Sequence, residues 1–186
     1  MKVLVAEDES LIRLDLVETL KSLDFEVVAA VGNGEEAVAA AKKLEPDVVL
    51  LDVKMPIMDG LSAAEALTEH GYCCILITAF SSTEIVNRAV EIGVDGYIVK
   101  PWRIDNLRPA IEIGYAQSRR RNELVADVES SQQELADQKL IDRARAIVIS
   151  KYQISEAEAF KVMQRSAMDG RVPMIEIART IIDLEN

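Results

Sequence analysis

The stretch Val48-Val49-Leu50-Leu51-Asp52 decides the fold, because four successive apolar residues predict a short buried strand with a polar residue at its end. The same arrangement recurs in the first hundred residues at 3–8, 75–78 and 97–100. Helical patterns separate these apolar runs, so we expect the strands to be parallel and covered on both faces. The sequence therefore predicts an α/β fold for this part of the chain.

Polar side chains stand at the ends of these four predicted strands: Glu7-Asp8, Asp52, Thr78 and Lys100. Taken singly they have ordinary explanations, since acidic residues cap loops, threonine suits strands and lysine is usually solvated. Parallel strands bring their carboxyl ends to one edge of the sheet, where open α/β folds place their sites. Because the four positions follow one another in order along the strands, we expect them to converge on one pocket.

The residue types of this pocket suggest phosphoryl chemistry. Carboxylates packed together repel one another, and oxygen ligands without a nearby His or Cys favour Mg²⁺ over zinc or copper. Asp52 is the candidate nucleophile, since carboxylates can form acyl phosphates. The Thr78 hydroxyl and the Lys100 ammonium would bind the remaining phosphoryl oxygens. A cis Lys100-Pro101 bond would turn the lysine into the pocket, and the sequence leaves the isomer open.

Length and composition set the class of protein. With 186 residues, of which 49% are hydrophobic, we expect one domain and a smaller module. The absence of a membrane-length apolar stretch and of a leader predicts a cytoplasmic protein without a membrane partner. The adjacent Cys73 and Cys74 are expected to be reduced core residues, and His70 to be solvated.

The net charge of −11 is unevenly distributed along the chain. Residues 1–110 hold 10 Lys/Arg against 19 Asp/Glu, a net −9, whereas residues 111–186 hold 11 against 13, a net −2. Acidity therefore belongs mostly to the first domain, and the C-terminal module remains compatible with a phosphate backbone.

The first 118 residues resemble the receiver domains of two-component systems. The resemblance is carried by four segments: Val3-Leu4-Val5-Ala6-Glu7-Asp8-Glu9, Asp52-Val53-Lys54-Met55-Pro56-Ile57-Met58-Asp59-Gly60, Thr78-Ala79 and Gly96-Tyr97-Ile98-Val99-Lys100-Pro101. It implies a five-stranded, flavodoxin-like parallel sheet whose Asp52 takes a phosphoryl group from a sensor histidine kinase. It also implies Mg²⁺ held by Glu7, Asp8, Asp52 and the backbone carbonyl of Lys54.

The resemblance further implies a switch pair, Thr78 and Tyr97. The hydroxyl moves towards the phosphoryl group and the aromatic ring reorients. The family's commonest first acid is Asp, where this chain has Glu7. Such a receiver is expected to be a switch that catalyses only its own phosphorylation and dephosphorylation, and not a turnover enzyme.

A helical linker is expected over residues 119–138. Residues 102–118 have the pattern of a last receiver helix, with Pro109 limiting how early its regular part starts. The following run, 123–139, lacks Gly and Pro, so we expect the helix to continue. Leu124, Val128 and Leu135 fit a heptad seam interrupted by Ser131 and Gln138. A homodimer seam and a solvated connecting helix both remain open, and Arg119-Arg120-Arg121 is interpreted as a solvated charge cluster.

Residues 139–186 predict a small three-helix bundle. One apolar stripe runs through Leu140, Ala144, Ile147 and Val148. Ser155 and Glu158 form a capping box before a helix expected to bury Ala159, Phe160, Met163 and Ala167 and to end at Asp169-Gly170. Pro173 suits the first position of a third helix, with Ile177, Ala178, Ile181 and Ile182 on its apolar face.

This tail resembles the ANTAR module of RNA-binding antiterminators over roughly residues 128–184. The resemblance is carried by 139–147, 155–160, 167–169 and 175–178. It implies a response regulator that dimerises on phosphorylation and binds paired RNA hairpins. Where the family usually has Ala-Lys-Gly, this chain has Ala144-Arg145-Ala146. Arg145, Lys151 and Arg165 are the expected RNA contacts, and Tyr152 is a candidate for base stacking.

Two other outputs stay open at this point. Three short helices also suit a DNA-binding helix-turn-helix, although the last one carries Glu176, Arg179 and Asp183 on its polar side, where a major-groove reader needs more Arg, Lys, Asn or Gln. The other output is a tail that binds a protein.

Overall fold

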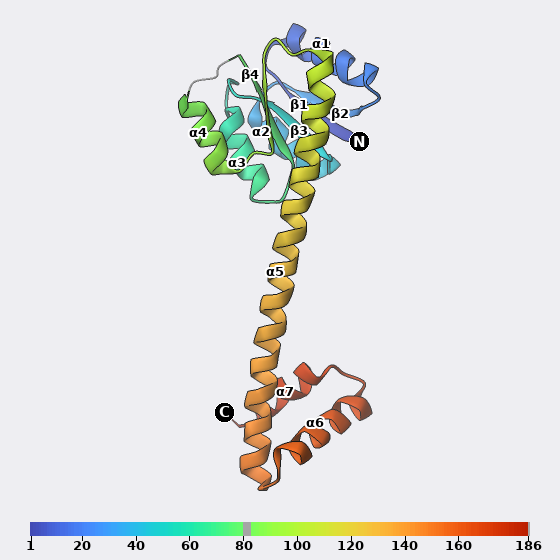
Figure 1. Ribbon diagram of the computed structural model, residues 1–186, viewed down its shortest axis with the longest axis vertical. Coiled ribbons are helices and arrows are strands. Elements are labelled where there is room, and N and C mark those ends of the chain that lie inside the picture. The colour runs from blue at the N-terminus through green and yellow to red at the C-terminus, as the bar shows by residue number, and fades with distance from the viewer. Residues whose placement is uncertain (80–82, 186) are drawn as a thin grey trace. The chain divides into compact units, whose positions relative to one another are not determined.

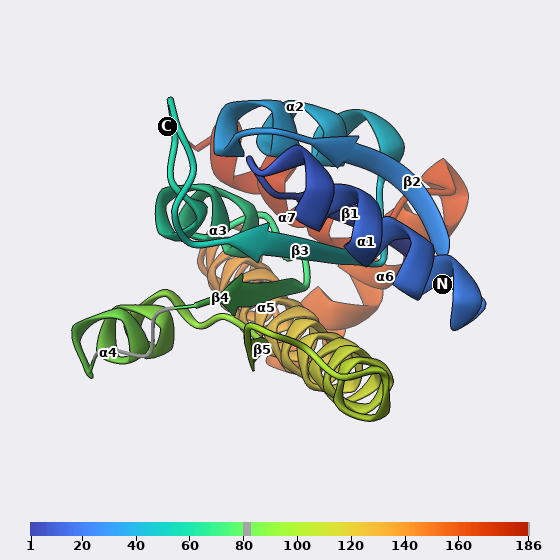
Figure 2. The ribbon, with the colours of Figure 1, turned by 90° about the horizontal axis from the view of Figure 1, so that it is seen from above.

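The computed structural model describes residues 1–79 and 83–185, which fall into two compact units, residues 1–123 and 124–186. The first unit is built on a five-stranded parallel sheet in the order β2-β1-β3-β4-β5 (Figures 1 and 2). This confirms the predicted fold class. The strands are β1 Lys2–Ala6, β2 Glu26–Val31, β3 Val48–Asp52, β4 Cys74–Thr78 and β5 Gly96–Val99.

Strand β2 was expected only through the family resemblance and had no apolar run assigned to it. It lies at the edge of the sheet beside β1, and most of its residues are partly buried rather than buried. Strands β3 and β4, by contrast, are buried at every position. An edge strand needs no continuous apolar run, so its sequence signal is weaker.

Helices cover both faces of the sheet because alternate residues of each strand point to opposite faces. Val3 and Val5 of β1 belong to a core with α1 (Ser10–Ser22) and the start of α5 (Ile104–Tyr152). Leu4 and Ala6 belong to a second core with α2 (Gly34–Leu44), α3 (Gly60–Thr68) and α4 (Thr83–Ile92). Strand β3 pairs with β1 and β4 and is covered by an apolar core on each face.

Helix α5 is continuous over 49 residues, which confirms that the last receiver helix runs on into the second unit. The helix begins at Ile104, so Pro109 lies inside it. The expectation that this proline would limit how early the regular helix starts is wrong. Within residues 1–123, Leu107 and Ile111 of α5 are fully buried against the sheet. The apolar residues of the predicted seam are exposed: Leu124 by 60%, Val128 by 55% and Leu135 by 64%.

The second unit packs the C-terminal turns of α5 against α6 (Glu156–Gly170) and α7 (Met174–Asp183). Its core contains residues of all three predicted stripes: Ala144, Val148, Ala159, Met163, Ala178 and Ile182. The capping box is present, since Ser155 Oγ accepts from the Glu158 backbone N–H and the Glu158 carboxylate accepts from the Ser155 backbone N–H. The three-helix prediction is therefore confirmed.

Three details of this unit differ from the sequence-based expectation. Phe160 was expected in the core but is 40% exposed, because the buried row of α6 runs through positions 159, 163 and 167. Gly170 is the last helical residue, and the left-handed residue that ends α6 is Arg171, with φ 53°. Pro173 precedes α7 as its N-cap instead of occupying the first helical position.

Within the described residues, no helix combines the length and apolar character that crossing a bilayer requires.

Candidate functional site

The sheet brings the predicted site residues to one edge. Asp52 is the last residue of β3 and Thr78 the last of β4, while Glu7 and Asp8 follow β1 and Lys100 follows β5. The strands are in register at their ends, with Asp52 opposite Ile77 and Thr78 opposite Val99. Convergence of these positions was predicted from the strand pattern, and the structure has this arrangement.

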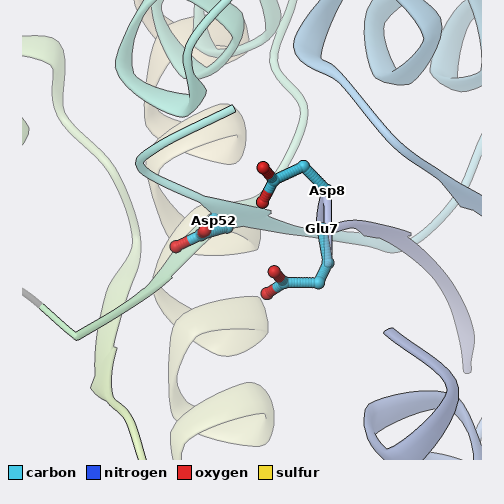
Figure 3. Close-up of side chains that lie close together, drawn as sticks. All are labelled: Glu7, Asp8 and Asp52. Atoms are coloured by element: carbon cyan, nitrogen blue, oxygen red, sulfur yellow. The ribbon is translucent and has the colours of Figure 1, made fainter. Parts of the chain in front are cut away.

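Three carboxylates form the centre of the site. One oxygen each from Glu7, Asp8 and Asp52 lies within 4.8 Å of the others, and Figure 3 shows the three side chains gathered at the ends of β1 and β3. Glu7 is 1% exposed and Asp52 7% exposed, whereas Asp8 is solvent-exposed. Two buried carboxylates beside a third carry a repulsion that a cation relieves.

Lys100 supplies positive charge to this group. Its Nζ donates to Glu7 Oε2 at 2.6 Å and lies 3.2 Å from Asp52 Oδ2. The Lys100-Pro101 bond, whose isomer the sequence left open, is cis. At distances of 2.6 and 3.2 Å, the ammonium bridges the two buried carboxylates.

Burial dominates the acidity of the site. It raises the pKa of Glu7 and of Asp52 above the usual carboxyl range, against the opposing effect of Lys100. For Lys100 burial acts to lower the pKa, but the hydrogen bond to Glu7 and the charge of Asp52 outweigh it and raise the pKa. An ammonium held by two carboxylates in this way stays charged throughout the neutral range.

The donor set fits a hard divalent cation. All three carboxylates offer oxygen, which suits Mg²⁺, and no His or Cys belongs to the cluster that the described residues form. A cavity of about 670 Å³ opens beside them and is lined by Asp8, Asp52, Lys54 and Lys100. Leu11 of α1 and Trp102 complete part of its wall. The acidic group can thus hold a metal while leaving room for a phosphoryl group.

Gly60 keeps the loop after β3 close to Asp52. Its backbone N–H donates to the Val53 carbonyl at 3.0 Å, and a Cβ at position 60 would overlap the Asp52 carbonyl. The Asp52 carboxylate accepts from the Val53 backbone N–H at 2.9 Å. A residue without a side chain is therefore required at this first position of α3.

Thr78 and Tyr97 come from neighbouring strands. Thr78 is fully buried, and Ala79, which follows it, lines the cavity beside Asp52. Tyr97 is partly buried and packs against the core formed with α2, α3 and α4. The hydroxyl and the aromatic ring therefore occupy adjacent strands, β4 and β5.

A buried ion pair that the sequence did not reveal lies at the amino-terminal ends of β4 and β5, away from the acidic site. Asp95 is 8% exposed, and its carboxylate accepts from Arg121 Nη1 at 2.5 Å and from the Cys74 backbone N–H at 3.1 Å. Arg121 also donates to the Gly93 carbonyl at 3.0 Å. The expectation that Arg121 belongs to a solvated cluster is wrong, because this residue ties α5 to the sheet.

The predicted RNA contacts in the second unit have different surroundings. Arg145 pairs with Asp142 and lies 3.5 Å from a carboxylate oxygen of Glu156, and Lys151 pairs with Glu185 at 3.0 Å. Arg165 is exposed, and the described residues supply no ion-pair partner for it. The structure thus gathers no common site from these three residues.

Two protein families match this chain. A model described as "Response regulator receiver domain" matches residues 3–112, and a model described as "ANTAR domain" matches residues 129–182. The chain belongs to the response regulators. It has a receiver domain and an ANTAR domain, as both resemblances predicted.

Relatives and solved structures agree with this assignment. The transcriptional regulatory protein PdtaR of Mycobacterium tuberculosis strain H37Rv is 40% identical over 183 residues, which is 98% of this chain and 89% of PdtaR. The receiver of the putative response regulator NarL from the same species is 30% identical, with a TM-score of 0.59 over 62% of this chain and 95% of that one. CheY of Borrelia burgdorferi, solved with CheX, BeF3 and Mg²⁺, is 27% identical with a TM-score of 0.57 over 60% and 86% of the two chains.

These findings decide the class of function. A receiver domain implies a kinase as phosphodonor, and an ANTAR domain implies RNA binding. The response regulator is accordingly a two-component regulator that acts as an RNA-binding antiterminator. Both matching domains are regulatory domains. The DNA-binding alternative loses its basis, since the three C-terminal helices that suggested it are those of the ANTAR domain.

Proposed function

We propose that Asp52 accepts a phosphoryl group from a sensor-kinase histidine, and that its phosphorylation controls RNA binding by the ANTAR domain. The observation that carries the proposal is the placement of Asp52 between two further carboxylates and the Lys100 ammonium. A carboxylate oxygen of Asp52 would form the new P–O bond while the P–N bond to histidine breaks, with the imidazole keeping the electron pair.

Glu7, Asp8, Asp52 and the backbone carbonyl of Lys54 would hold Mg²⁺ in this proposal. Bound Mg²⁺ supplies a positive charge that offsets charge on the phosphoryl oxygens. Support comes from the oxygen-only donors and from the Borrelia CheY complex, which was solved with BeF3 and Mg²⁺. Glu7 in place of the commoner Asp adds one methylene, and its carboxylate still lies within the 4.8 Å group.

Lys100 and Thr78 would complete the phosphoryl site. The ammonium, now 3.2 Å from Asp52 Oδ2, would transfer its contact to a phosphoryl oxygen. The Thr78 hydroxyl would approach a second oxygen, and the Tyr97 ring would repack in the space beside β5. The change at Asp52 would in this way reach the face of β5 and α5. The same pocket would later admit water to remove the phosphoryl group.

Dimerisation through α5 is the proposed output step. The exposed Leu124, Val128 and Leu135 would pair with a second copy, and two ANTAR domains would bind paired RNA hairpins together. A solvated connecting helix is the alternative for the same residues. Two linked modules on one RNA gain affinity without new contacts, so phosphorylation need not alter the RNA-binding surface itself.

Labelling of Asp52 tests the proposal. The protein is incubated with radiolabelled acetyl phosphate and Mg²⁺, and Asp52→Asn is expected to abolish the incorporated label. Asp15→Asn is the matched control, because Asp15 is an exposed carboxylate that lines the same cavity. Undiminished labelling of the Asp52→Asn variant would overturn the nucleophile assignment.

A further inference from the structure

Helix α6 has one buried row and a broad exposed face beside it. Ala159, Met163 and Ala167 are the buried row, at spacings of four residues. At about 100° per residue, the adjoining arc of roughly 140° holds six residues, all of them exposed. We call these residues the α6 face: Ala157, Phe160, Lys161, Gln164, Arg165 and Met168.

The α6 face is positively charged in an acidic chain. It carries Lys161 and Arg165 and no carboxylate, although the chain has a net charge of −11. Of the acids of this helix, Glu158 and Asp169 border the face on the side of Arg165, and Glu156 lies on another arc. Among the described residues neither cation of the face forms an ion pair, in contrast to the cations near the end of α5. An external anion would therefore displace no salt bridge of Lys161 or Arg165 within the described residues.

An aromatic ring and an amide lie among these cations. Phe160 is 40% exposed and Met168 72% exposed, and Gln164 lies between them on the same arc. A surface hollow of about 420 Å³ is lined by four residues of the α6 face, Lys161, Gln164, Arg165 and Met168, and by Val162 and Asp169 beside it. Single-stranded RNA is recognised by this combination, in which rings stack on unpaired bases, amides bond base edges and cations pair with phosphates.

We infer that the α6 face is the surface that binds the loop of an RNA hairpin, with Phe160 stacked on an unpaired base and Lys161 and Arg165 on backbone phosphates. The inference rests on the proposed function and assigns RNA contacts to α6. Arg145 and Lys151 then serve the ANTAR fold, since each is already paired within it. Charge complementarity favours RNA over a protein partner, because the two cations of the face form no salt bridge among the described residues and can pair with phosphates.

Phe160 is tested by binding to RNA in the full chain carrying a beryllofluoride phosphoryl mimic and Mg²⁺. The probe is a hairpin selected by the wild-type protein from a pool with randomised loops, and a fully paired RNA duplex is the comparison. Phe160→Ala is expected to weaken hairpin binding by about 5- to 150-fold, the loss of one stacked base, without changing duplex binding. Phe160→Tyr keeps an aromatic ring and is expected to retain wild-type binding.

The two cations are tested by salt dependence. The double variant Lys161→Gln/Arg165→Gln is expected to make the salt dependence shallower. The negative slope of log affinity against log salt should shrink in magnitude by about 1.4, or about 0.7 for each lost phosphate contact. Arg179→Gln is the control, because Arg179 is an exposed cation of α7 outside the α6 face. Its slope is expected to equal that of the wild type.

The outcomes separate this inference from the function on which it rests. One outcome is that the wild type binds the hairpin and the Phe160→Ala and double variants bind it equally well. In that case the assignment of RNA contacts to the α6 face is wrong, and the proposal that the protein binds RNA stands. If the wild type binds no member of the pool, the proposed RNA control fails and the inference fails with it. An equal loss with Arg179→Gln would show a general charge effect and overturn the assignment of phosphate contacts to α6.

Discussion

At the scale of single residues, Lys100 decides how the acidic group behaves. Its ammonium lies 2.6 Å from Glu7 Oε2 and 3.2 Å from Asp52 Oδ2, so it already neutralises part of the charge that would attract a metal. The same ammonium would stabilise a phosphoryl group on Asp52. Lysine at this position is therefore expected to weaken Mg²⁺ binding before phosphorylation and to strengthen binding of the phosphoryl group.

The first prediction follows from this double effect. Lys100→Met is expected to tighten Mg²⁺ binding to the unphosphorylated protein, because two buried carboxylates lose their counter-charge. It is also expected to weaken beryllofluoride binding by about tenfold or more, the loss of one charge-assisted contact. The single tryptophan, Trp102, lines the cavity, so its fluorescence can report both titrations. Lys43→Met on α2 is the control, and weaker Mg²⁺ binding by Lys100→Met would contradict the argument.

At the scale of elements, the junction of α5 with the sheet is more specific than a solvated helix. Arg121 donates to the buried Asp95 and to the Gly93 carbonyl, and Asn122 Nδ2 donates to the Gly71 carbonyl at 2.7 Å. These contacts fix α5 to the receiver beyond residue 112, where the match to the receiver family ends. They give this part of the linker a defined orientation relative to β4 and β5.

The second prediction concerns this junction. Arg121→Ala would leave the Asp95 carboxylate buried and without its cation, and is expected to destabilise the receiver by about 2–3 kcal/mol. The cost falls below that of a fully buried pair because the Arg121 side chain is 34% exposed. Arg119→Ala is the control, since its pair with Glu123 is solvent-exposed and worth less than about 1 kcal/mol. Urea unfolding measures both, and equal losses would contradict the assignment.

The strand pattern predicted a parallel sheet and the convergence of Glu7, Asp52 and Lys100, because an apolar run that ends in a polar residue is a local signal. The pair Asp95–Arg121 escaped prediction, since its partners are 26 residues apart and only the packed helix brings them together. Phe160 was misplaced for a related reason. Helical periodicity identifies a buried stripe, but packing against the other helices decides how wide the stripe is. Here it includes Ala159, Met163 and Ala167 and leaves the adjacent Phe160 ring exposed.

At the scale of the whole molecule, receiver and ANTAR domains share the single helix α5. The apolar residues of its middle part are exposed in the chain described here, and a second copy would bury them. Phosphorylation would then act by raising the fraction of dimer.

The third prediction tests this seam. Beryllofluoride with Mg²⁺ is expected to raise the dimer fraction in sedimentation velocity, and Val128→Asp is expected to abolish that rise by placing like charges opposite each other in the seam. Val125→Asp is a useful comparison, because Val125 is 51% exposed and lies outside the heptad positions. A dimer that persists in Val128→Asp but is lost in Val125→Asp would place the seam on another face of α5.

The central claim is that phosphorylation of Asp52 controls RNA binding. The most direct measurement compares binding to paired-hairpin RNA and to DNA duplex of matched sequence, with and without beryllofluoride and Mg²⁺, for the wild type and Asp52→Asn. We predict binding to RNA alone, stimulated by the mimic in the wild type and insensitive to it in Asp52→Asn. Preference for DNA, or RNA binding that the mimic leaves unchanged in the wild type, would contradict the account.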